Sequence, residues 1–104
     1  MPTVEDFLAY IPIDYPDDVT RKNATRALAG AKKTFYGAVG EDVEQLLPGD
    51  ERATEVVLMF AKDLYEQRGY TSAKVSGTTR LLAADMILQL QMDLRRLREE
   101  AAQA

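Results

Sequence analysis

Two clusters of acidic residues are the features of this sequence that most resemble a metal-binding site. Asp14, Asp17 and Asp18 lie close together, and Glu41 and Glu44 form an ExxE step. The first cluster lacks the Asp/Asn ladder, the glycine and the terminal glutamate of a calcium loop. The ExxE step is of the kind that all-α nucleotide pyrophosphohydrolases use for magnesium, but the second, downstream ExxD-type pair that those enzymes need is missing. Helix capping by Asp17 or Asp18 is the better interpretation, and we expect no metal site.

The residues of the common nucleophilic and phosphate-binding motifs are also missing. The chain contains no Cys and no His, which excludes disulfides, the usual zinc sites and nucleophiles activated by His. Gly37, Gly40 and Gly49 have the spacing of neither a P-loop nor a dinucleotide-binding fingerprint. We therefore expect no catalytic residue, no cofactor and no enzymatic activity.

Sequence-specific DNA binding is also disfavoured. A helix-turn-helix is conceivable over residues 69–82. The second helix would then carry Leu-Leu-Ala-Ala-Asp, whereas a recognition helix carries polar and basic side chains at these positions. The 17 acidic and 13 basic residues give a net charge of −4, which repels phosphate backbones. DNA can pass near such a protein, but we do not expect the protein to bind it tightly.

Length and composition indicate one globular domain, residues 1–104. Of these, 46% are apolar and 29% charged, as in ordinary folded proteins. No stretch approaches the roughly 18 uncharged apolar residues of a spanning helix. The opening MPTVEDF carries acids where a signal peptide needs a basic region. We expect a cytoplasmic protein with no membrane partner.

The spacing of apolar residues predicts an all-α fold, a small bundle of two or three long helices with a short N-terminal helix and one mobile loop. Thr3 and Asp50 are suitable N-caps. The run Val56–Ala61, VVLMFA, is apolar nearly all round, which indicates a central helix. The predicted helices cover residues 4 to about 11, 18 to about 36, 51 to about 68, and 80 to about 101, with one or two helical turns in 41–47.

The polar segment 69–79 is longer than most connections between helices. It is either a simple crossover between antiparallel helices or a functional loop that faces a partner. In the second case its candidate contact residues are Tyr70, Thr71, Ser72, Lys74 and Ser76.

The last predicted helix has two apolar faces when its residues are projected at about 100° per residue. The main face comprises Leu82, Ala83, Met86, Ile87, Leu90, Leu94 and Leu97. The second, nearly opposite, comprises Leu81, Ala84, Leu88 and Met92. One face can pack on the core, and burying each large residue of the other is worth roughly 1.5–3 kcal/mol. A neighbouring subunit could cover the second face, and so could the first helix or the 69–79 loop. Near its end lies a positive patch that is either solvated or docks on an acidic partner: Arg95, Arg96 and Arg98.

Several segments resemble the phage head–tail connector family, also called head-completion or DNA-packaging adaptor proteins. They are the opening VEDFLAYIPIDYPDD, the Ala-rich helix ending in Phe35-Tyr36-Gly37, the motif Leu47-Pro48-Gly49-Asp50, and the helix end Leu64-Tyr65-Glu66-Gln67-Arg68. The resemblance covers roughly residues 4 to 95. Many relatives finish soon after a short segment leading to an arginine, whereas this chain continues as a long predicted helix through Arg98, which leaves the partner geometry at that end open.

The resemblance implies a closed ring of about twelve subunits in which each contacts two neighbours. The ring would bind the portal protein and a downstream neck or tail-completion protein, with genomic DNA passing through its lumen without sequence-specific binding. Such a subunit is found in the host cytoplasm during assembly and then in the virion, at the head–tail interface. The second apolar face and the arginine patch would form the subunit or portal interface, and the 69–79 loop would face a partner or the lumen. The alternative is a small helical protein-binding adaptor or an antitoxin-like regulatory module.

Overall fold

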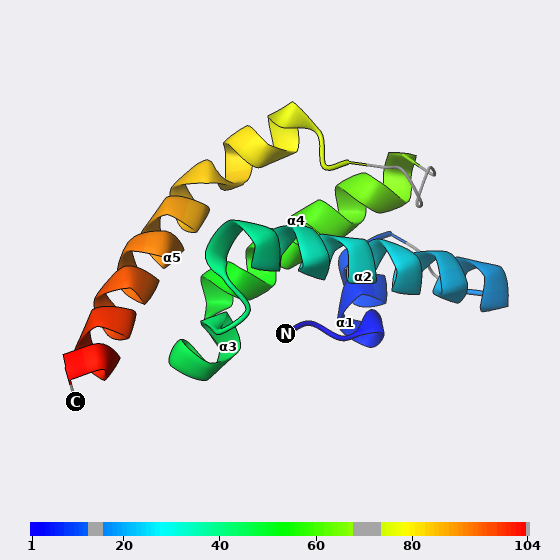
Figure 1. The fold of residues 1–104 in the computed structure, drawn as a ribbon. Coiled ribbons are helices and arrows are strands. Elements are labelled where there is room, and N and C mark those ends of the chain that lie inside the picture. Colours follow the sequence, from blue (N-terminus) through cyan, green and yellow to red (C-terminus); the bar gives the residue numbers. More distant parts are fainter. Residues whose placement is uncertain (13–15, 68–73, 104) are drawn as a thin grey trace.

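The computed structural model describes residues 1–12, 16–67 and 74–103, and within these ranges the chain is all-α (Figure 1). Its helices are α1 (Val4–Tyr10), α2 (Asp18–Val39), α3 (Val43–Leu46), α4 (Glu51–Gln67) and α5 (Gly77–Gln103). The predicted small helical bundle with a short N-terminal helix is confirmed.

The helix starts follow from local side-chain chemistry. Thr3 forms a capping box with Asp6, and Asp17 accepts from the Thr20 backbone N–H at 2.7 Å. Asp50 accepts from the backbone N–H groups of Arg52 and Ala53. These side chains satisfy donors that a helix N-terminus leaves unpaired. The predicted caps are therefore confirmed, and Asp17 is the residue that caps α2.

Two predicted boundaries are wrong. The helix expected to stop near Tyr36, with Gly37 and Gly40 after it, runs on through Gly37 to Val39, because burial of Val39 offsets the weak helix propensity of one glycine; Gly40 is its C-cap, as expected. The last helix begins at Gly77 instead of residue 80, because Ser76 caps it by accepting from the Thr79 backbone N–H at 3.3 Å. Residues 77–79 are thus helical and not part of a loop.

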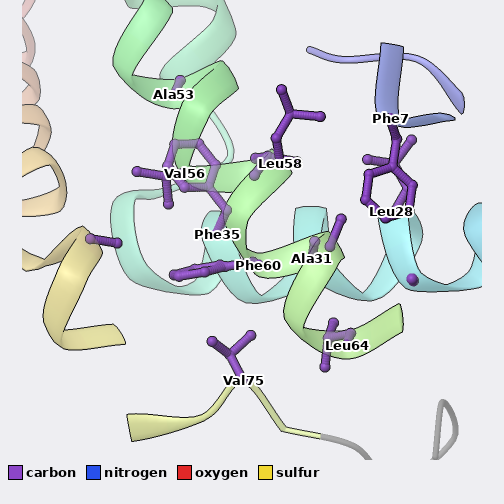
Figure 2. Packing of buried hydrophobic residues seen from close by; sticks show 14 of the residues in the cluster. Phe7, Leu28, Ala31, Phe35, Ala53, Val56, Leu58, Phe60, Leu64 and Val75 are labelled. Atoms are coloured by element: carbon purple, nitrogen blue, oxygen red, sulfur yellow. The ribbon is translucent and has the colours of Figure 1, made fainter. Parts of the chain in front are cut away.

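The core lies where α2 meets α4. Figure 2 shows Phe35, Val56 and Phe60 together there, with Val75 pointing toward them. Small residues on α2 let α4 approach closely, and a Cβ on Gly30 would lie 3.2 Å from Leu64 Cδ1. The run Val56–Ala61 is buried except for the partly buried Met59, so the prediction of a central helix is confirmed.

Helix α5 runs antiparallel to α4 and packs mainly against it. At one end Arg52 forms ion pairs with Asp50 at 2.8 Å and with Asp93 at 2.9 Å. At the other end the Ser76 backbone N–H donates to Asp63 Oδ2 at 2.8 Å. The end of α5 and the start of α2 lie at opposite ends of the molecule, whose principal extents are 50 × 25 × 21 Å (Figure 1).

Candidate interaction surface

The side of α5 that faces away from the core carries large apolar side chains in water. Leu81 is 77% exposed, Leu88 54% and Met92 63%, and Ala84 is also exposed. We call these four residues the α5 outer face. On the opposite side Ala83, Leu90 and Leu94 are fully buried. The prediction that α5 has two apolar faces, of which only one packs on its own core, is confirmed for these residues.

Helix α1 does not cover the α5 outer face. It packs on α2 and α4, with Phe7 fully buried and its ring edge-on to Tyr65 at a centroid distance of 6.0 Å. At the described end of the loop, Val75 is buried in the core, away from the α5 outer face. The alternative in which the first helix folds over this face is therefore wrong.

Leu82 was predicted to belong to the buried face, and this is wrong because it is 68% exposed. Successive residues of a helix point about 100° apart, so when Ala83 faces the core, Leu82 projects to the side, toward α4. There it borders a hollow of about 230 Å³ whose apolar lining residues are Tyr10, Met59 and Leu82. We call this the α4–α5 hollow.

Arg98 is engaged within its own chain. Its Nε donates to Asp42 Oδ2 at 2.8 Å, and its Nη2 donates to Asp42 Oδ1 at 2.5 Å and to the Val39 carbonyl at 2.8 Å. These hydrogen bonds from the guanidinium lower the pKa of the Asp42 carboxyl below its usual value. The structure thus shows Arg98 joining α5 to the end of α2, whereas its predicted role at an interface stays a prediction.

The Arg98 contact depends on Gly40. This residue ends α2 with φ 108° and ψ 151°, a backbone conformation that side chains strongly disfavour. A Cβ there would collide with the Arg98 guanidinium and lie 2.9 Å from Asp42 Oδ1. Neither Gly40 nor Asp42 was singled out from the sequence as a partner of Arg98, because 56 residues separate Asp42 from Arg98.

Arg95 and Arg96 remain available to a partner. Both are exposed, and neither takes part in an ion pair among the described residues. On the helix they project to either side of the line through Leu88 and Met92, at the end of the α5 outer face. An apolar stripe that ends between two cations fits a protein surface with apolar and acidic parts.

The candidate loop residues have different outcomes. Tyr70, Thr71 and Ser72 lie outside the described residues, and Lys74 is exposed. Ser76 was expected to face a partner or the lumen, but its hydroxyl is engaged within the chain. Its hydroxyl lies 3.2 Å from Asp63 Oδ1 and 3.1 Å from Thr79 Oγ1, so its polar groups bind α4 and cap α5. Its function is to fix the start of α5.

Two residues of the acidic clusters have structural roles in the part of the chain that is described. Asp17 caps α2, and Glu44 pairs with the N-terminal amine at 3.1 Å. Asp14 lies outside the described residues. Among residues 1–12, 16–67 and 74–103, no three His, Cys, Asp or Glu side chains gather as metal ligands would. The same ranges contain no helix with the length and apolarity needed to cross a membrane.

Comparison of the chain with protein-family models, with characterised proteins and with solved structures finds no match. The feature that bears on function is therefore the surface of α5 itself. That surface offers exposed apolar side chains with cations at one end, an arrangement suited to contact with another protein.

Proposed function

We propose that this chain is a structural subunit that assembles through the α5 outer face, and that the assembly is a phage head–tail connector ring beneath the portal. One observation carries the proposal: Leu81, Leu88 and Met92 are each more than half exposed and lie in line on one helix. Burying such side chains is worth roughly 1.5–3 kcal/mol each before the costs of association are subtracted. Extended apolar patches on a small protein usually mark contact sites.

The connector identity is supported by the sequence resemblance and by charge. A closed ring needs a subunit that contacts two neighbours. With a net charge of −4, a channel wall built from this chain would repel DNA and let it slide. In this proposal the partners are other copies of the chain, the portal protein and a downstream neck protein. The subunit assembles in the host cytoplasm and becomes part of the virion.

The proposal is tested by mixing the purified chain with the portal protein of the same phage and imaging the product by electron microscopy. We expect rings attached to the portal with the wild-type chain, and none with Leu88→Asp. Val19→Asp is the matched control, because Val19 is an apolar residue 67% exposed on α2 and is likewise replaced by an aspartate. A wild-type chain that neither binds the portal nor associates with itself would contradict the proposal. A chain that instead binds one acidic partner as a monomer would identify an adaptor.

A further inference from the structure

We infer that neighbouring copies meet head to tail, with the α5 outer face of one copy packed antiparallel on the exposed face of α4 of the next, beside the α4–α5 hollow. This inference rests on the proposed function, since it names the two surfaces that make the subunit contact. The occupant of the α4 face is thus a second copy of this chain.

The first support is that the chain carries two different apolar surface features. The α5 outer face projects outward, whereas the hollow is lined by Tyr10, Met59 and Leu82. Leu82 and Leu88 are six residues apart and point about 120° apart around the helix, so the two features face different directions. A ring in which every contact is the same requires two unlike patches, whereas a two-fold dimer through the α5 outer face would leave the hollow empty.

The second support is that charges on the two helices match in one direction only. On α5, Asp85 and Arg96 are eleven residues apart, and on α4, Glu51 and Lys62 have the same spacing. Eleven residues make about three turns, so each pair lies on one side of its helix about 16 Å apart. All four side chains are exposed. Of these four side chains, only Lys62 forms an ion pair with a described residue, a long one of 3.9 Å with Glu66.

An antiparallel contact brings Asp85 to Lys62 and Arg96 to Glu51. A parallel contact would bring Asp85 to Glu51 and Arg96 to Lys62, so that like charges face each other. Opposite charges across an interface fix its register, and like charges disfavour the wrong one. The charges therefore select the antiparallel arrangement.

The third support is that the register set by these charges also matches apolar residues. Three residues after Asp85 on α5 is Leu88, and three residues before Lys62 on α4 is Met59, which lines the hollow, so these two side chains lie opposite each other. Counting seven residues places Met92 opposite Glu55, whose carboxylate lies 3.5 Å from the Tyr10 hydroxyl. The alignment set by the charges thus brings one apolar pair, Leu88 and Met59, into contact beside the hollow.

Cysteine cross-linking tests the alignment without background, because the chain has no cysteine of its own. The double variant Glu55→Cys/Met92→Cys is treated with a short bismaleimide at concentrations where wild-type protein associates. Both positions are exposed, so the fold is expected to survive. We expect a ladder of covalent multimers from the double variant, no covalent product from either single variant, and dimers only from their equimolar mixture.

Three results would overturn the inference. Covalent dimers from Met92→Cys alone would show that the α5 outer face meets itself. An associated double variant without cross-links would show that α4 is not the neighbour's surface, and in both cases the proposed function stands. A wild-type chain that is monomeric at every concentration, both alone and with the portal protein, would contradict both proposals. As a second measurement, Asp85→Lys is expected to weaken association at least tenfold, and adding Lys62→Asp to restore most of it.

Discussion

Replacing Gly40 by alanine tests the contact that holds the C-terminal half of α5 to the end of α2. The backbone of Gly40 has φ 108° and ψ 151°, and forcing a side chain into such a region costs about 1–3 kcal/mol. The new Cβ would also displace the Arg98 guanidinium from Asp42 and from the Val39 carbonyl. The two effects act in the same direction, so we expect Gly40→Ala to lower the free energy of unfolding by at least the cost of the strain.

Urea unfolding followed by circular dichroism measures this change. A loss of about 2 kcal/mol would lower Tm by roughly 8–16 °C in a domain of this size. The matched control is Gly37→Ala, since a Cβ at Gly37 meets nothing within 4 Å. Because alanine is the better helix former, this control should gain about 0.5–1 kcal/mol. In Arg98→Met the Arg98 contact is already absent, so Gly40→Ala should then cost the strain alone.

Two outcomes would refute the reasoning. Gly40→Ala could prove as stable as wild type, which would mean that the backbone relaxes without cost. Alternatively, Gly37→Ala could destabilise as much as Gly40→Ala, which would mean that any added methyl group near the end of α2 is harmful and that the Arg98 contact is irrelevant.

Three further predictions concern the core, pH and charge. Leu90 is fully buried, so Leu90→Ala should lower the free energy of unfolding in urea by about 2–5 kcal/mol. Leu88→Ala should change it by no more than about 0.5 kcal/mol. Equal losses in the two variants would contradict the assignment of the two faces. Arg52 lowers the pKa of Asp50, and Arg98 lowers the pKa of Asp42. In acid the unfolded chain therefore binds more protons than the folded chain. We expect Tm to fall as pH drops below about 4 and to remain level from there to neutrality. Arg52→Met should flatten that acid limb, and an unchanged profile would refute the stated cause. Arg96→Glu should weaken self-association and Glu51→Arg should restore it, as measured by light scattering, with failure of the rescue counting against the proposed charge pairing.

Most of the secondary structure is predictable because it depends on local chemistry. The caps at Thr3, Asp17 and Asp50 need only a side-chain oxygen and the next turn of backbone. The two faces of α5 follow from periodicity alone, and the exposure of Leu81, Leu88 and Met92 agrees with it. These features do not require knowledge of where the other helices lie.

The features that were missed depend on how distant elements meet. Leu82 lies within the apolar arc of α5, but α4 contacts the helix along a narrower strip and leaves that side chain at a hollow. From the sequence, Arg98 is indistinguishable from a free surface cation. In the structure, the turn at Gly40 places Asp42 beside it. A conformation with positive φ at one of several glycines carries no local sequence signal that separates Gly40 from Gly37.

Sedimentation velocity of wild type, Leu88→Asp and Val19→Asp over a wide range of concentrations tests most directly whether α5 binds another copy. We expect the wild type and Val19→Asp to form species larger than a dimer as concentration rises, and Leu88→Asp to sediment as a folded monomer throughout. A Leu88→Asp chain that associates as well as wild type would contradict the account, and so would a wild-type chain that remains monomeric both alone and with the portal protein.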